Sequence, residues 1–174
     1  MVIDLKKCAE RPLHVQDRFD LAARFASYPE VETIDAVEAE LDVAPVGGHK
    51  FLVDGRFQAS LTAYCVRCLE PFPVSIGESF RITYLPESER PADAHGEGEM
   101  STGEIDIAYH RGEQLEVLPL LEEQINLAFP MRFLCAEQCR GLCQHCGANK
   151  NRDPCGCREP SQDPRLEVLK TLLD

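Results

Sequence analysis

The sequence lacks the motifs that mark the common classes of enzyme. It contains no G-x-S-x-G, no phosphate-cradling glycine loop and no H-E-x-x-H. Its adjacent carboxylates, such as Glu122 and Glu123, point away from a common site if they lie on a helix. We therefore predict that the protein is not an enzyme and has no small-molecule substrate.

Long apolar runs are also missing. No stretch approaches the roughly 20 apolar residues that are needed to cross a bilayer, so no membrane partner is expected. The first residues, MVIDLKKCAERPLHV, carry two lysines without the apolar segment of a secretory signal. The sequence predicts a cytoplasmic protein, and the cytoplasm keeps thiols reduced.

Basic residues are scarce, and they are unevenly distributed. The 174 residues carry a net charge of −12. Residues 1–129 hold 11 basic and 24 acidic residues, a balance of −13, whereas residues 130–174 hold 7 and 6, a balance of +1. Phosphate neutralisation dominates nonspecific affinity for nucleic acids. The first 129 residues are therefore excluded as a general RNA-binding surface, and only the tail is electrostatically open to RNA.

The hydrophobic pattern predicts an α+β fold, with an antiparallel β-meander sheet of about four strands packed with one or two helices. Strands are expected at 37–43, at 71–86 as one or two, and at 104–108; residues 49–65 read as a hairpin that turns at Asp54-Gly55. Helices are expected over 113–129, with Pro119 in the first turn, and over 163–173, with Asp163 as N-cap. Residues 1–30 give no clear assignment.

Composition divides the chain into two parts. Residues 1–129 are expected to form an acidic α+β sheet domain, interrupted at 86–103 by a flexible acidic loop that is rich in proline and glycine. Residues 130–174 are expected to form a cysteine-rich, zinc-binding C-terminal module followed by the C-terminal helix.

Cysteine is abundant for a chain expected in a reducing compartment, which favours metal binding over disulfides. Of nine cysteines, Cys8 stands alone and is expected to be a small buried hydrophobe. The other eight are Cys65, Cys68, Cys135, Cys139, Cys143, Cys146, Cys155 and Cys157. Four thiolates complete one tetrahedral zinc site, so eight are enough for two structural zinc ions.

The spacing suggests how the eight divide. Two C-x-x-C pairs, at 65 and 143, bring two sulfurs to one metal within a tight turn, and Gly147 suits such a turn. One zinc is assigned to the four cysteines within a 15-residue window, which are Cys143, Cys146, Cys155 and Cys157. Cys65 and Cys68 would then meet Cys135 and Cys139 across the fold, and this second site would attach the tail to the sheet.

Other cysteine chemistries fit the context less well. A thioredoxin-like pair needs a helix N-terminus, but Pro71 and Pro73 follow Cys68 in strand-like sequence. The radical-SAM spacing at 139–146 is followed by only 28 residues, too few for the barrel of such enzymes, although an iron–sulfur cluster stays an alternative. A catalytic zinc keeps an open position, which complete quartets lack, and His145 is expected at the surface.

Several segments together resemble one known family. YCVRCLEPF, EEQINLAFP, CRGLCQHCGANKN and DPRL, in this order over about residues 50–173, resemble the YceD family of large ribosomal RNA subunit accumulation proteins. The resemblance implies a role in the synthesis, processing or stability of large-subunit ribosomal RNA, without a known enzymatic activity. The matching positions include the eight cysteines, with residues 140–142 and 147–151 as the turns that hold them.

Two functional hypotheses follow. The first is a binding factor that contacts large-subunit ribosomal RNA or a pre-ribosomal particle through the tail, with phosphate contacts from Arg132, Arg140, Lys150, Arg152, Arg158 and Arg165. The second is an adaptor whose acidic sheet domain binds a basic ribosomal protein or another basic partner, because opposite charge steers association.

Overall fold

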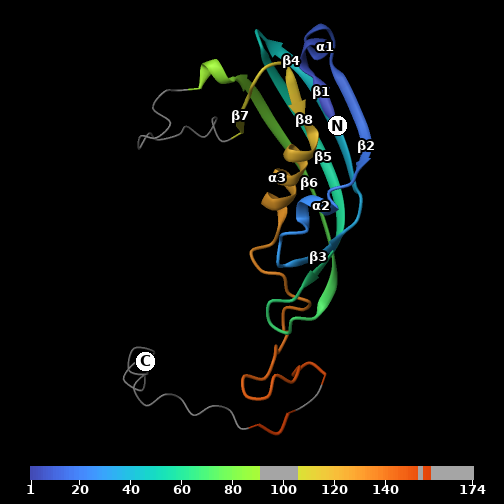
Figure 1. Ribbon diagram of the computed structural model, residues 1–174, viewed down its shortest axis with the longest axis vertical. Helices are drawn as coiled ribbons and strands as arrows, with labels where there is room; N and C mark the ends of the chain where they lie inside the picture. Colours follow the sequence, from blue (N-terminus) through green and yellow to red (C-terminus); the bar gives the residue numbers. More distant parts are fainter. Residues whose placement is uncertain (91–105, 153–154, 158–174) are drawn as a thin grey trace, which may run out of the picture.

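The fold is a mixed β-sheet with its helices gathered on one face (Figure 1). The structure is a computed structural model, and it describes residues 1–90, 106–152 and 155–157. The strands are β1 (Val2–Asp4), β2 (Leu13–Phe19), β3 (Val31–Ile34), β4 (Val37–Gly47), β5 (Lys50–Tyr64), β6 (Pro71–Pro86), β7 (Ile107–His110) and β8 (Gln114–Glu116). The helices are α1 (Leu5–Glu10), α2 (Ala22–Phe25), η1 (Glu87–Glu89) and α3 (Val117–Ala128). The expected α+β class is confirmed.

The main sheet has the order β2-β4-β5-β6-β7, and β3 pairs with the C-terminal end of β5. Strands β1 and β8 form a separate pair. Every pairing is antiparallel except β6 with β7, which is parallel. The predicted meander is thus correct for β4, β5 and β6. The strand expected at 104–108 overlaps β7 at residues 107–108, residues 104–105 lie outside the described residues, and the direction of β7 departs from the meander.

Apolar and acidic residues alternate along β4, which explains why one face of the sheet is buried. Val37, Ala39, Leu41 and Val43 are buried, whereas the acidic residues between them point to the opposite face. The expected strand is confirmed, and it continues through Pro45 to Gly47. The buried face packs against α3 and the β1–β8 pair, and the opposite face is polar.

The hairpin turn predicted at Asp54-Gly55 is wrong. Both residues lie inside the continuous strand β5, opposite Asp42 and Leu41 of β4. Gly55 serves close packing, since a Cβ there would lie 2.3 Å from the Phe80 ring. The turn between β4 and β5 lies instead at Gly48 and His49, and the φ angles of Gly47 (+111°) and Gly48 (+59°) suit glycine.

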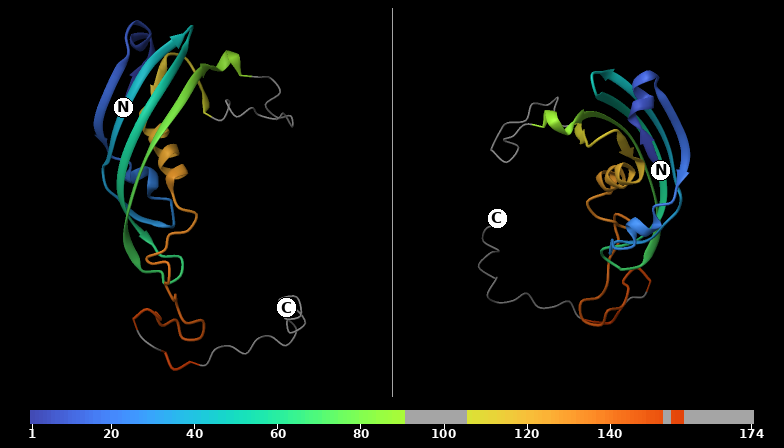
Figure 2. Two further views of the ribbon diagram at one scale, coloured as in Figure 1. Left: turned by 180° about the vertical axis from the view of Figure 1, so that it is seen from behind. Right: turned by 45° about the horizontal axis from the view of Figure 1, so that its top comes forward.

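Helix α3 leads the chain toward the cysteines. The helix expected over 113–129 is found from Val117 to Ala128, with Pro119 in its first turn, whereas Gln114–Glu116 form β8 instead. The helix buries Val117, Leu120, Leu121 and Ile125 against the sheet. Beyond its end, Phe129 packs edge-on to Phe133, and the Phe133 carbonyl accepts a hydrogen bond of 3.0 Å from the amide of Val66. This contact places the segment after α3 beside the β5–β6 turn (Figure 2).

The N-terminal residues supply elements that the sequence pattern left unassigned. They form β1, α1, β2 and α2, and Ile3, Leu5, Phe19 and Phe25 enter the core. Cys8 is fully buried in α1, as expected, and belongs to neither quartet. The predicted helix over 163–173 and most of the predicted loop 86–103 lie outside the described residues. In the part of the chain that the structure describes, no helix is long and apolar enough to cross a membrane.

Candidate metal centre

The eight cysteines gather into two groups of four. Cys65, Cys68, Cys135 and Cys139 form the first quartet, and Cys143, Cys146, Cys155 and Cys157 form the second. Within each quartet all four Sγ atoms lie within 4.8 Å of one another. The division is the one that the spacing predicts, and the first quartet joins the β5–β6 turn to the segment after α3.

The first C-x-x-C pair lies in a tight turn at the end of β5. The Leu69 amide donates to the Cys65 carbonyl at 2.8 Å, and the Cys65 amide donates to the Glu70 carbonyl at 3.0 Å. Leu69 has a φ of +57°, which makes it the one described non-glycine residue with positive φ. The turn leaves backbone N–H groups pointing at the first sulfur of the pair.

The second C-x-x-C pair repeats this geometry bond for bond. The Gly147 amide donates to the Cys143 carbonyl at 2.9 Å, and the Cys143 amide donates to the Ala148 carbonyl at 2.8 Å. Gly147 occupies the position equivalent to Leu69, with a φ of +72°. Two separate segments therefore fold into the same turn, as expected for two sites with the same ligand geometry.

These turns make the first cysteine of each pair acidic. Burial raises the pKa of Cys65, but the backbone N–H groups of Cys135, Cys68 and Arg67 outweigh it and lower the pKa to about 6. The backbone N–H groups of Cys146 and His145 likewise lower the pKa of Cys143 to about 6. Each quartet thus contains one sulfur that is prepared to ionise near neutral pH.

Four other sulfurs, those of Cys68, Cys135, Cys155 and Cys157, have raised pKa values and resist ionisation when no cation is present. Burial, followed by the sulfur of Cys68, raises the pKa of Cys135 to about 12. The sulfurs of Cys146 and Cys143 raise the pKa of Cys157 to about 12. Four thiolates so close together repel one another, and a divalent cation at their centre would reverse this repulsion.

The donor set and its spacing fit a tetrahedral metal ion. The Sγ atoms of Cys65 and Cys139 are 3.8 Å apart, and those of Cys68 and Cys135 are 3.7 Å apart. Four sulfurs around one zinc at about 2.3 Å would be separated by about 3.8 Å. None of the nine cysteines forms a disulfide. The two quartets could therefore each hold a metal ion.

Hydrogen bonds connect the two quartets. The Leu142 amide donates to the Arg67 carbonyl at 3.0 Å, and the Arg67 guanidinium donates to the carbonyls of Glu137 and Cys139, both at 3.0 Å. Gly141 is needed at this contact, because a Cβ there would lie 2.9 Å from the Arg67 carbonyl oxygen. The segment that begins the second quartet thus packs directly against the turn of the first quartet.

Sequence reasoning gave no partners to three polar residues at the contact between the quartets, which are Glu70, Asn149 and Asn151. The Glu70 carboxylate accepts hydrogen bonds from Asn149 at 3.4 Å and from Arg152 at 2.9 Å. The Asn151 amide donates to the Cys139 sulfur at 3.2 Å. The signal was present in the matching segments CLEPF and GANKN, whose polar residues had no assigned partners.

The predicted RNA-contacting residues are partly brought together. Arg140, Lys150 and Arg152 lie on the loop of the second quartet, and Arg132 lies after α3. Arg152 pairs with Glu70, whereas no carboxylate of the described residues lies within ion-pair distance of Arg132, Arg140 or Lys150. Arg158 and Arg165 lie outside the described residues.

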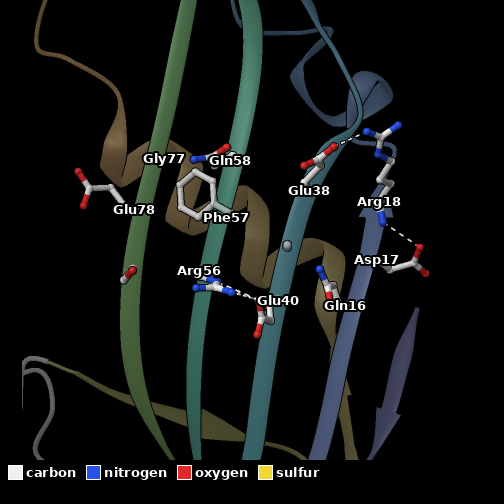
Figure 3. Close-up of a pocket in the computed structure, with 12 residues that line it drawn as sticks. Gln16, Asp17, Arg18, Glu38, Glu40, Arg56, Phe57, Gln58, Gly77 and Glu78 are labelled. Carbon is white, nitrogen blue, oxygen red and sulfur yellow. Dashed lines mark hydrogen bonds and ion pairs between the residues drawn. The ribbon is translucent and has the colours of Figure 1, made fainter.

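Apart from the cysteine quartets, an open hollow lies on the polar face of the sheet. Figure 3 shows this open hollow of about 800 Å³ over β2, β4, β5 and β6. Arg18 pairs with Glu38 and Arg56 with Glu40 across neighbouring strands. Because both arginines are paired and Asp17 and Glu78 also line it, the hollow has no excess of positive charge.

Fold and site together define a class: an acidic α+β sheet protein with two cysteine quartets, one of which ties the C-terminal segment to the sheet. The model of the family described as "Large ribosomal RNA subunit accumulation protein YceD" matches residues 53–173. The chain belongs to this family.

Curated relatives agree with this assignment. The chain is 27% identical over 142 residues to the chloroplastic large ribosomal RNA subunit accumulation protein YCED homolog 1 of Zea mays, and 25% identical over 144 residues to that of Arabidopsis thaliana. These matches cover 70% and 72% of this chain but 48% and 45% of the plant proteins, so the chain spans about half their length. An uncharacterized protein of Mycobacterium tuberculosis is 26% identical over 99% of this chain and 81% of its own. No solved structure matches.

Proposed function

We propose that this protein is a non-enzymatic, zinc-binding factor that promotes the synthesis, processing or stability of large-subunit ribosomal RNA. Membership of the YceD family, whose description names the accumulation of this RNA, is the observation that carries the proposal. The two complete cysteine quartets support a structural and not a catalytic metal, because four sulfurs leave no position for a substrate or an activated water. We place its action in the cytoplasm.

Zinc is the metal that we propose for both quartets. It accepts four thiolates in tetrahedral geometry and has no redox chemistry of its own. Cys65, Cys68, Cys135 and Cys139 would hold one ion and so fix the segment after α3 to the end of the sheet. Cys143, Cys146, Cys155 and Cys157 would hold the other and fix the loop that carries Arg140 and Lys150.

The tail is the surface that we propose for RNA. Arg132, Arg140 and Lys150 lie on or beside the quartets and have no ion-pair partner among the described residues. Arg152, Arg158 and Arg165 would add further positive charge. Phosphate contacts by these groups would position the protein on an RNA without reading its sequence.

A second function is favoured by the charge of the sheet domain. A balance of −13 over residues 1–129 attracts basic proteins, and ribosomal assembly supplies such partners. We propose that the sheet domain binds a basic ribosomal protein. The two functions are compatible, since they use different parts of the chain.

Gradient sedimentation of a cell lysate tests the main proposal. We expect the protein, tagged and made at its natural level, to sediment with large-subunit precursors and to leave them after ribonuclease treatment. The double variant Arg140→Glu with Lys150→Glu should shift to the top of the gradient, whereas Arg18→Glu, on the polar face of the sheet, should not. Sedimentation with free proteins only, with or without ribonuclease, would contradict direct action on the precursor particle.

A further inference from the structure

Strand β6 has a long edge with which no described residue pairs, called the free edge below. The strand runs over 16 residues and pairs with β5 from Pro71 to Tyr84, in a register without a bulge. On its other side it pairs with β7 only from Thr83 to Pro86. From Pro71 to Ile82, no described residue pairs with this side, and Figure 2 shows β6 in green at the border of the sheet.

The direction of the free backbone groups can be worked out from one hydrogen bond. The Thr83 amide donates to the Asp106 carbonyl at 2.8 Å, so Thr83 directs its backbone groups away from β5. Because these groups alternate along a strand, Ser75, Gly77, Ser79 and Arg81 direct theirs to the same free side. They form a ladder of donors and acceptors that ends at Pro73, which has no N–H.

This edge lacks several of the usual protections of an exposed strand. Its stretch from Val74 to Arg81 contains no lysine, proline or bulge. Val74, Ile76 and Phe80 are only partly buried on the face that carries α3. An extended chain at this edge could bond to the ladder and cover these apolar side chains at the same time.

The free charges around the edge are negative. Glu78 is exposed and has no ion pair among the described residues, whereas Arg81 is already paired with Asp54 at 2.6 Å. Helix α3, which packs on β6, carries the exposed Glu123. Leu127, one turn after Glu123 on α3, is 73% exposed.

We propose that the free edge of β6 binds an extended, lysine- or arginine-rich segment of a partner protein, which adds a strand to the sheet. The unpaired ladder requires an extended chain, the partly exposed apolar side chains require alternate apolar residues, and Glu78 requires positive charge. This inference rests on the protein-binding function proposed above and is independent of RNA contact by the tail.

A fluorescent peptide in which lysine and valine alternate is the probe, titrated against the full chain with its metal bound. A control peptide of the same sequence carries N-methyl groups on alternate backbone amides, which removes hydrogen bonds and keeps the charge. We expect the unmodified peptide to bind about tenfold more tightly than the methylated one. Equal affinity of the two peptides would overturn the proposal.

Matched variants locate the site. Ser79→Pro removes an N–H that faces the free side and leaves the β5–β6 pairing intact, so we expect binding to weaken about tenfold, while Ser79→Ala binds as the parent does. Glu78→Lys should weaken binding more than Glu10→Lys, which makes the same charge change on α1. Equal effects within either pair would overturn the proposal. So would a dimer of the chain that Ser79→Pro converts to a monomer, since the edge would then serve a second copy.

Sedimentation distinguishes this failure from failure of the RNA proposal. The Ser79→Pro protein should still enter ribonuclease-sensitive particles through its tail, because the tail is separate from the β6 edge. Complete loss of the Ser79→Pro protein from these particles, with an unchanged melting temperature, would show that RNA and protein binding are not independent. It would overturn the assignment of protein binding to the β6 edge and of RNA binding to the tail.

Discussion

At the scale of single residues, the two C-x-x-C turns form a natural comparison. They have the same backbone hydrogen bonds, but Leu69 occupies the left-handed position in one and Gly147 in the other. A left-handed conformation costs an L-residue about 1–2 kcal/mol, and glycine adopts it freely. Leu69 is 62% exposed, so little burial offsets that cost.

We predict opposite effects of exchanging these residues. Leu69→Gly should raise the free energy of unfolding by about 0.5–1 kcal/mol, because relief of strain exceeds the added freedom of the unfolded chain. Gly147→Ala should lower it by about 1 kcal/mol. Denaturant titration of the zinc-loaded protein measures both, with Gly112→Ala as a control for a left-handed glycine outside the turns. A destabilising Leu69→Gly would contradict the strain argument.

The sequence could predict the cysteines but not the polar residues that support them. Spacing alone divides eight cysteines into the two quartets that the structure brings together. Glu70, Asn149 and Asn151 act through partners that are distant in sequence, and a pattern of residue types does not encode such contacts. The same reason explains Gly55, which resembles a turn residue locally but is required by the approach of Phe80 from another strand.

At the scale of elements, the first quartet holds the chain where secondary structure ends. Helix α3 stops at Ala128, and the segment that follows is tied to the β5–β6 turn by Cys135 and Cys139. The second quartet lies entirely beyond this point and rests on the first through Arg67 and Gly141. Loss of the first quartet should therefore disturb the second, whereas loss of the second should leave the first intact.

We predict different proteolysis patterns when each quartet is broken. Cys68→Ser should expose cleavage sites from residue 130 onward, whereas Cys146→Ser should expose only sites beyond residue 140. The reason is that apparent binding energies of structural zinc are on the order of 10–16 kcal/mol and few other contacts hold these segments. Limited trypsin digestion with mass mapping is the measurement.

Cys8→Ser is the matched control for these variants, because its sulfur belongs to neither quartet. It should leave both cleavage patterns unchanged. Identical digestion of the Cys68→Ser protein and the parent, or no effect of a chelator on either segment, would contradict the proposed structural metal.

Hydrophobic alternation could predict the strands that form one side of the core, but not how they connect. The buried positions of β4 follow a strict period of two, so that strand was predictable. The parallel pairing of β7 and the addition of β1 and β8 depend on contacts between residues more than 20 positions apart. The division into an acidic sheet domain and a cysteine-rich module stays a prediction.

At the scale of the whole molecule, two surfaces differ in charge, one on the sheet and one on the cysteine-rich segment. The sheet carries most of the negative charge and the free β6 edge, which suits a basic protein segment. The cysteine-rich segment carries Arg132, Arg140 and Lys150, which have no ion-pair partner among the described residues. A protein built this way could join an RNA to a protein during assembly, and zinc would keep the two surfaces in a fixed relation.

The most direct test of this account is the ratio of large- to small-subunit ribosomal RNA in cells that naturally make the protein. We predict that deleting its gene lowers the ratio and that the parent or Cys8→Ser restores it. The double variants Cys68→Ser with Cys135→Ser and Cys146→Ser with Cys157→Ser should fail to restore it at equal protein levels. An unchanged ratio after deletion, or full restoration by the quartet variants, would contradict the account.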